Sequence, residues 1–385
     1  MKRSNFVALA FVLAFGLAAI HAAQPEYTNR FEVLQNEALR QDFTIQGEYL
    51  AKTERFSMGL HLIADGDGKF RVVNYPGGLP GDGWKAGEPR MLGTAKVEGD
   101  EITITMTEGR GTLPGGESVQ VPENIEAKGK ITIERSQGRQ GQEGRQRGGF
   151  RGPSVKIEIA ATEKMPEMIF EKQFRTSPTF GEQAPEGAVV VFDGTNLDMF
   201  EPGAKINEAP QRPGAEQGQR QRPAGFGNTL WAEATSLPFE KKPYKLHVEF
   251  MLSYMPTAQG QARSNSGVYI DQSYECQVLD SFGLEGENNE CGGFYQVSKP
   301  AINMCFPPLT WQTYDFDFTP AKFDGDTKVE NARISVKHNG VLIHDSVELP
   351  KETPGRLAEG PEPRGVYLQG HGNKVQYRNI WLQYK

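Results

Sequence analysis

The sequence predicts an all-β protein. Its 44 glycines and 25 prolines separate short runs in which apolar and polar residues alternate with the period of a β-strand. Amphipathic helical periodicity is hard to find, and frequent turns between short elements are typical of sandwiches and barrels. Because 385 residues exceed the size at which a single core usually stops growing, we expect two domains.

The first 23 residues have the pattern of a secretory signal peptide. Two basic residues precede an apolar stretch (6–20), which is followed by the small pair Ala22-Ala23. The apolar stretch is too short for a stable membrane span, and no later segment offers roughly 18 consecutive apolar residues. We therefore expect a secreted or periplasmic protein with no transmembrane anchor after signal cleavage. The formal net charge of -7 gives no reason to expect a nucleic acid as partner.

Residues 24–184 are expected to form a smaller N-terminal antiparallel β domain. Strand-like runs occur at 43–49, 59–63, 70–73, 102–106, 130–133 and 155–159. The Asp-Gly-Asp-Gly segment at 65–68 lacks the remaining positions of a calcium loop and is interpreted as a hairpin turn. The loop 75–84 either exposes Trp84 to a sugar ring or folds it back onto the sheet. The stretch 136–152 has no apolar face to bury and is expected to be a disordered insertion.

A cluster of prolines and glycines between 178 and 187 marks the domain boundary. The C-terminal domain, residues 185–385, has strand-like runs at 189–198, 244–252, 265–270, 274–280, 311–316, 332–341, 367–372 and 377–380. Strands at this spacing predict a β-sandwich. A second low-complexity insertion is expected at 209–226, and His338-Asn339-Gly340 is interpreted as a type I′ hairpin turn.

These C-terminal segments, in this order, resemble the 3-keto-disaccharide hydrolase domain family. The matching motifs are Phe192-Asp193-Gly194, Asn265-Ser266-Gly267, Tyr274-Glu275-x-Gln277-x-Leu279-Asp280, Trp311, His338-Asn339-Gly340, Gln369-Gly370-His371-Gly372 and Arg378-Asn379-Ile380. The resemblance covers about half of the chain and implies a concanavalin A-like jelly roll that handles carbohydrate. Because this fold carries both binders and enzymes, it implies the fold more firmly than an activity.

The resemblance implies cleavage of the glycosidic bond of 3-keto-disaccharides or related glycosides. A ketone at C3 acidifies the proton on C2, so a base can remove it and expel the C1 substituent, after which water adds. We expect Glu275 or His371 as the base and Asp280 or His371 as the acid, on the concave face of the jelly roll. The alternative is a non-catalytic carbohydrate-binding module of the cell envelope.

Binding roles are expected for a second group of residues. Asn265, Gln277, Gln369 and Arg378 are candidates to hold sugar hydroxyls or the enolate oxygen, and Trp311 is either a sugar platform or core. Strand alternation places Glu275 and Gln277 on one face, whereas Asp280 joins them only if a β-bulge follows Gln277.

The cysteines and histidines bear on cross-links and metals. Of Cys276, Cys291 and Cys305, the last two lie in loop-like sequence and are expected to form a disulfide in an exported protein. The six histidines are scattered, with no His-x-His or Cys-x-x-Cys spacing, so neither zinc nor another cofactor is expected. A structural calcium ion is common in this fold and cannot be read from the sequence.

Overall fold

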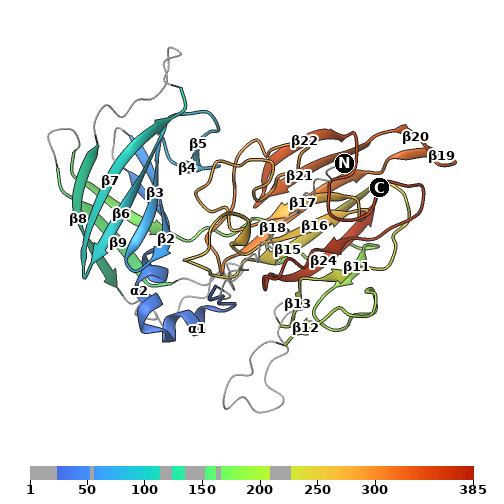
Figure 1. The fold of residues 1–385 in the computed structure, drawn as a ribbon, viewed down its shortest axis with the longest axis horizontal. Helices are drawn as coiled ribbons and strands as arrows, with labels where there is room; N and C mark the ends of the chain where they lie inside the picture. Colours follow the sequence, from blue (N-terminus) through green and yellow to red (C-terminus); the bar gives the residue numbers. More distant parts are fainter. Residues whose placement is uncertain (1–23, 53–55, 113–123, 135–151, 162–165, 209–226) are drawn as a thin grey trace, which may run out of the picture.

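The computed structural model describes residues 24–52, 56–112, 124–134, 152–161, 166–208 and 227–385. Within these ranges the chain forms two β domains that lie side by side (Figure 1). The all-β prediction is confirmed. The expected signal peptide and both expected insertions lie outside the described residues, apart from Gly152 at the end of the first insertion.

The N-terminal domain is a closed antiparallel barrel whose strands pair in the order β1-β10-β9-β8-β7-β6-β3-β2, with β2 returning to β1. The strands are β1 (Gly47–Lys52), β2 (Ser57–Gly66), β3 (Lys69–Pro76), β6 (Arg90–Glu98), β7 (Glu101–Arg110), β8 (Ile125–Glu134), β9 (Ser154–Ile159) and β10 (Met168–Gln173). The short strands β4 (Leu79–Pro80) and β5 (Gly83–Trp84) pair with each other. Apolar side chains such as Leu62, Phe70 and Ile157 fill the barrel, as is usual for eight strands.

Two short helices precede the barrel, α1 (Arg30–Gln35) and α2 (Glu37–Ile45). Each begins after an asparagine whose side chain accepts a hydrogen bond from a backbone N–H of the first turn, at Asn29 and Asn36. The prediction of a strand from residue 43 is therefore wrong for its first four residues, because 43–45 complete α2 and Gln46 is its C-cap. The strand begins at Gly47.

The C-terminal domain is a jelly roll of two sheets. The large sheet consists of β12 (Ile206–Asn207), β13 (Thr229–Trp231), β24 (Gln376–Tyr384), β15 (Tyr244–Met251), β18 (Trp311–Thr319), β21 (Ala332–His338) and β22 (Val341–Leu349), with β11 (Val189–Phe192) also paired to β24. The small sheet consists of β14 (Ala234–Thr235), β23 (Tyr367–Leu368), β16 (Ser266–Ile270) and β17 (Tyr274–Val278). A hairpin of β19 (Lys322–Asp324) and β20 (Thr327–Glu330) and the 3-10 helix η1 (Gly260–Ala262) complete the domain.

The core of the jelly roll lies between its two sheets. Val248 and Phe250 of β15 and Phe316 of β18 enter it from the large sheet, and Val268 and Cys276 enter it from the small sheet. Because strand side chains alternate, every second residue lies on the opposite face of its sheet, which we call the outer face. Each sheet therefore offers one outer face to a ligand or to another part of the chain.

Two hairpin turns agree with the sequence analysis. The turn at Asp67-Gly68 joins β2 to β3, and Asn339-Gly340 joins β21 to β22 with φ of 49° and 81°. Positive φ at both central residues is the geometry of a type I′ turn. The loop tryptophan is folded back: Trp84 is 7% exposed and its indole N–H donates to the carbonyl of Pro89 at 3.0 Å.

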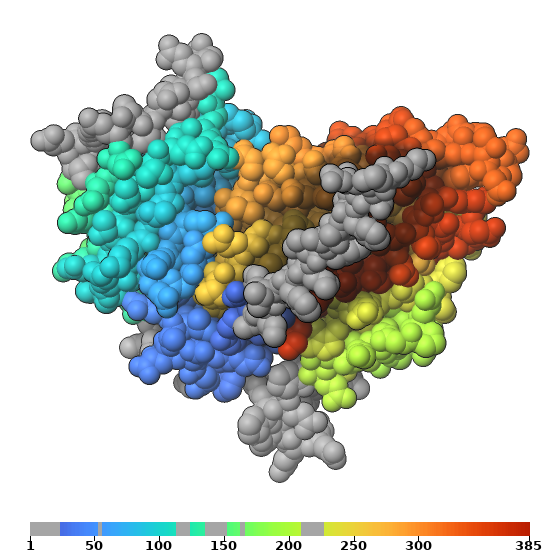
Figure 2. Space-filling model, viewed as in Figure 1, coloured from blue at the N-terminus to red at the C-terminus, as the bar shows by residue number. Residues whose placement is uncertain are grey.

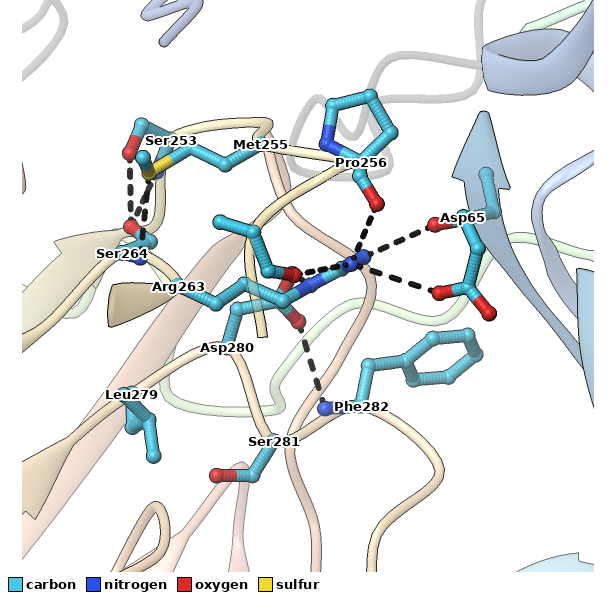
Figure 3. A network of polar contacts seen from close by, with 12 residues as sticks. Asp65, Ser253, Met255, Pro256, Arg263, Ser264, Leu279, Asp280, Ser281 and Phe282 are labelled. Carbon is cyan, nitrogen blue, oxygen red and sulfur yellow. Dashed lines mark hydrogen bonds and ion pairs between the residues drawn. The ribbon is translucent and has the colours of Figure 1, made fainter. Parts of the chain in front are cut away.

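A buried arginine joins the two domains. Arg263 donates through Nε to Asp280 Oδ2 at 2.6 Å, and its Nη2 donates to the carbonyl of Ala64 in the barrel at 3.2 Å. Its Nη1 donates to the carbonyl of Pro256 at 3.0 Å and lies 3.8 Å from Asp65 Oδ1 (Figure 3). Arg263 thus binds groups from both domains.

The residues just before α1 form a strap across the jelly roll. Glu26 accepts hydrogen bonds from the Ser253 hydroxyl at 2.6 Å and from the backbone N–H of Lys374 at 2.5 Å. Tyr27 forms a β-bridge with Tyr254. We call residues 24–28 the N-terminal strap. After them the chain enters the barrel domain, and it returns to the jelly roll only after β10.

In the space-filling view the blue-to-teal barrel meets the gold and orange segments of the jelly roll over a continuous surface (Figure 2). No helix among the described residues is long and apolar enough to cross a membrane.

Candidate active site

The outer face of the small sheet carries a group of polar and aromatic side chains. Cys276 of β17 enters the core, so its neighbours Glu275 and Gln277 point outwards. On β16, Tyr269 lies opposite Glu275 and Gly267 lies opposite Gln277. The candidate active site is this face, with Gly267, Tyr269, Glu275, Gln277, Tyr367 and Gln369.

Glu275 is a carboxyl group suited to exchange a proton near neutral pH. The residue is only 4% exposed, and the hydroxyl of Tyr269 lies 3.0 Å from its Oε2. Burial raises the pKa of Glu275 to about 7, and the hydrogen bond from Tyr269 offsets this only in part. A general base works best when its pKa lies near the pH of the reaction, so Glu275 has the properties of such a base.

The Tyr269 hydroxyl serves both protonation states of Glu275. Its oxygen lies 2.9 Å from the carbonyl of Pro354 as well as 3.0 Å from Glu275, yet the phenol has one proton for these two acceptors. When Glu275 is ionised, the phenol can donate to the carboxylate. When Glu275 is protonated, it can donate to the phenol oxygen while the phenol donates to Pro354. The two states therefore need no movement of heavy atoms.

Amide side chains surround this pair. Gln277 donates through Nε2 to Asn265 Oδ1 and to the carbonyl of Ser266, both at 2.7 Å. Asn265 in turn donates to the carbonyl of Gln261 at 2.9 Å, and Gln369 donates to the Tyr269 oxygen at 3.3 Å. The side-chain nitrogen of Gln277 is occupied by these bonds. Among the described residues none donates to its side-chain oxygen Oε1, which is therefore the atom that can accept a hydrogen bond from a ligand.

Two tyrosines and an arginine form the aromatic part of the face. The rings of Tyr269 and Tyr367 lie 5.7 Å apart, centroid to centroid. The guanidinium of Arg356 lies 4.1 Å from the Tyr367 ring centroid and donates to the Thr235 hydroxyl at 3.2 Å. Aromatic side chains with polar tips present both an apolar surface and hydrogen-bonding groups, which suits a sugar.

The structure does not bring all of the expected site residues together. Asp280 does not join Glu275, because it is buried against Arg263 in the contact between the domains. His371 lies on the exposed segment after β23. Of the three residues expected to transfer protons, only Glu275 is on the outer face of the small sheet as part of a strand.

Trp311 and Arg378 lie on the outer face of the other sheet. Arg378 donates to Glu249 Oε2 at 2.8 Å, and its guanidinium lies 4.0 Å from the Trp311 ring centroid and 4.7 Å from that of Phe180. The carboxylate partner of Arg378 is thus Glu249 and not Glu275. The expectation that Trp311 and Arg378 share a site with Glu275 is corrected by this geometry, because their strands belong to the large sheet.

One group of side chains among the described residues could hold a metal ion. Ligand atoms of Glu182, His247 and Asp315 lie within 4.8 Å of one another. However, His247 Nδ1 lies 2.6 Å from Asp315 Oδ1 and its Nε2 lies 3.5 Å from Glu249 Oε1. Burial lowers the pKa of His247, but Asp315 and Glu249 outweigh this and raise it to about 9. The imidazole is then a cation in an ion pair, whereas a metal ligand must be neutral.

All three cysteines are buried free thiols in the structure, so the expected Cys291–Cys305 disulfide is absent from it. The Cys291 and Cys305 side chains nevertheless contact each other, and Cys291 Sγ lies 3.2 Å from the Tyr314 hydroxyl. Cys276 belongs to the core, as the sequence analysis expected.

Comparison with known families extends this description. Residues 187–383 match the model of the 3-keto-alpha-glucoside-1,2-lyase-like domain, over about half of the chain and both sheets of the jelly roll. The chain belongs to this family. It is the family that the sequence motifs resemble, so that prediction is confirmed.

Two solved structures are similar to parts of the chain, both from Parabacteroides distasonis and each described as a "putative glycosyl hydrolase". The first is 23% identical, with a TM-score of 0.42, and covers 52% of this chain and 85% of that chain. The second is 14% identical, with a TM-score of 0.26, and covers 54% and 92%. Comparison with curated proteins gives no match.

Sequence reasoning missed several residues of the lyase-like domain that matter to this site. Tyr269 lies two residues beyond the glycine of the Asn265-Ser266-Gly267 motif, so alternation on that strand could have placed it on the same face as Gly267. Tyr367 lies on β23 opposite Tyr269 of β16, two residues before Gln369, which follows that strand. Arg356 belongs to a loop, and no periodic signal locates it.

Proposed function

We propose that the chain cleaves the glycosidic bond of a 3-keto-glycoside, with Glu275 as the base that takes the proton from C2. The observation that carries the proposal is a carboxyl group with a pKa raised to about 7 on a face of amides and tyrosines. Membership of the lyase-like family supports the substrate class.

The proposed reaction begins with removal of one proton. The Glu275 carboxylate takes the proton from C2, which the neighbouring C3 ketone makes acidic, and the electron pair moves onto the ketone oxygen as an enolate. When the enolate collapses, the bond between C1 and the leaving oxygen breaks and a C1–C2 double bond forms. The leaving oxygen takes a proton from an acid, for which His371 is the candidate.

Addition of water completes hydrolysis. Water attacks C1 and gives its proton to His371, which regenerates the acid, and protonated Glu275 returns its proton to C2, so the carboxylate is regenerated. Donors near the ketone oxygen would stabilise the enolate, and we assign this role to Gln369, whose amide has a second N–H besides the one that donates to Tyr269. We assign the side-chain carbonyl oxygens of Asn265 and Gln277 to accepting hydrogen bonds from sugar hydroxyls. These steps use side-chain groups, so the proposal invokes no cofactor.

We further propose that the protein acts outside the cytoplasm, either secreted or in a periplasm. The support is the sequence pattern of residues 1–23, in which basic, apolar and small residues follow one another. Oxidation of the contacting thiols Cys291 and Cys305 to a disulfide belongs to the same proposal.

The test compares Glu275→Gln with the parent protein on a panel of 3-keto and ordinary disaccharides. The amide keeps the shape of the side chain but cannot accept the C2 proton, so turnover should fall by about 10² or more while affinity changes little. Glu348→Gln is the matched control, since this exposed glutamate pairs with Arg333 on the far side of the jelly roll. Its turnover should match that of the parent.

Two outcomes would contradict the proposal. A Glu275→Gln variant with a near-normal rate would exclude Glu275 as the base. Binding of disaccharides by the parent protein with no product from any member of the panel would instead indicate a carbohydrate-binding module.

A further inference from the structure

A large pocket lies between the two domains, away from the candidate active site. It has a volume of about 1230 Å³ and is lined by residues of α1, of β1 and β10 in the barrel, of the connection after β10, and of β18 and β24 in the large sheet. We call it the interdomain pocket. Its volume exceeds the roughly 300–1,000 Å³ of most small-molecule sites, so a disaccharide or a larger ligand would fit.

The interdomain pocket is positively charged. Among the described residues that line it, four are cationic, namely Arg30, Lys172, Arg175 and Arg378, and only Glu48 is acidic. Glu48 is already engaged, because Arg175 binds both of its carboxylate oxygens. Arg378 is likewise paired, with Glu249. The remaining lining cations are Lys172 and Arg30, which donates to the Leu309 carbonyl at 2.9 Å and the Thr310 hydroxyl at 3.2 Å.

Lys172 contributes a partly buried cation to this pocket. Its ammonium group donates to the carbonyls of Thr44 at 2.6 Å and Gln46 at 2.5 Å, and no carboxylate among the described residues lies within ion-pair distance of it. Burial and the nearby charge of Arg30 lower the pKa of Lys172 to about 7. Two neighbouring cations that raise each other's energy are stabilised when an anion binds between them.

Aromatic side chains form much of the remaining wall. Phe31 and Phe174 are 73% and 39% exposed, and the Lys172 ammonium lies 5.6 Å from the Phe174 ring centroid. Trp311 and Phe306 line the opposite side, where the Arg175 guanidinium lies 5.1 Å from the Phe306 ring centroid. Exposed rings beside cations suit a ligand that has an apolar ring face and a negative group.

We propose that the interdomain pocket binds a carboxylated sugar, with the carboxylate held by Lys172 and Arg30 and the sugar ring against Phe31 and Phe174. The need for a negative charge follows from the pocket itself. The choice of a sugar as the ring rests on the proposed function. The interdomain pocket and the candidate active site lie on different sheets. A ligand can therefore bind in the pocket whether or not Glu275 catalyses the proposed reaction.

The test measures binding of D-glucuronate to the full mature chain by calorimetry at a pH just below 7, with D-glucose and the methyl ester of glucuronic acid as neutral analogues. Charge-assisted hydrogen bonds are stronger than neutral ones, so glucuronate should bind at least about tenfold more tightly than either analogue. Lys172→Met should lose about tenfold or more in affinity. The matched control is Lys156→Met, which changes a lysine of β9 that pairs with Glu171 and does not line the pocket.

Equal binding of glucuronate and glucose, or no binding of glucuronate, would overturn the proposal. Unchanged affinity in a folded Lys172→Met variant would do the same. If that variant fails to fold, the comparison of glucuronate with its methyl ester on the parent protein still tests whether the pocket needs a negative charge. Glu275→Gln should bind glucuronate normally, which separates failure of this proposal from failure of the proposed reaction.

Discussion

Replacing Asp280 with asparagine should weaken the contact between the two domains. The side chains of Arg263 and Asp280 are 2% and 0% exposed, and asparagine keeps the shape of aspartate while removing its charge. The guanidinium would retain backbone carbonyl acceptors and the more distant Asp65, 3.8 Å away. Removing one partner of a buried ion pair typically costs about 3–5 kcal/mol. Because Asp65 partly compensates, we expect a loss of about 3 kcal/mol, close to a hundredfold in the folding equilibrium.

Urea unfolding followed by tryptophan fluorescence measures this loss, because tryptophans are present in both domains. Asp317→Asn is the control: Asp317 is 42% exposed and pairs with Lys385 at the surface, so its replacement should cost less than about 1 kcal/mol. The double variant Arg263→Met/Asp280→Asn should lose less than the sum of the two single changes, since neither charge is then left unpaired.

A loss below about 1 kcal/mol in Asp280→Asn, or additive losses in the double variant, would refute the reasoning. The turnover of the Asp280→Asn variant is a second test. If Asp280 only stabilises the contact between the domains, the folded variant should keep its turnover. A large fall in turnover without a fall in stability would restore Asp280 as the acid of the reaction.

Three further predictions concern the candidate active site and the thiols. If ionised Glu275 is the base, kcat/KM should rise tenfold per pH unit below about pH 7 and level off above it, and a flat profile from pH 5 to 8 would contradict this role. Gly267→Ala would place a Cβ 2.3 Å from Glu275 Oε1 and so displace the carboxylate. Turnover should fall about tenfold or more with little change in melting temperature. An unchanged rate would show that the position of the carboxylate is not critical. In protein recovered from an oxidising compartment, denaturation without reductant should expose one free thiol, that of Cys276, and three free thiols would exclude the Cys291–Cys305 bridge.

Local pattern predicted some parts of this molecule and could not predict others. Alternation correctly separated Glu275 and Gln277 from the core residue Cys276, because the period of a strand is a property of the strand itself. The partner of Asp280 was not predictable in this way. Arg263 lies 17 positions earlier in the chain, and its burial depends on how the barrel packs against the jelly roll.

The sequence also could not predict which strand belongs to which sheet. Trp311 and Arg378 carry family motifs just as Glu275 does, but a motif does not say which of two sheets its strand joins. The helix over Glu37–Ile45 was missed because apolar residues at 43 and 45 fit a strand as well as a helix end. In that segment the asparagine caps were the better signal.

The N-terminal strap has a consequence for the order in which the molecule can assemble. Its acceptor groups meet partners near the other end of the chain: Glu26 binds Lys374, and the carbonyl of Thr28 accepts from Gln376 at 2.8 Å. These contacts span nearly 350 positions and can form only after the last strand of the jelly roll has been made. The barrel, whose strands are all contributed by residues 47–173, can close earlier. Residues 24–28 precede both domains in the chain but are therefore among the last to take their final position, and a tag fused ahead of Gln24 would lie next to the contacts that form last.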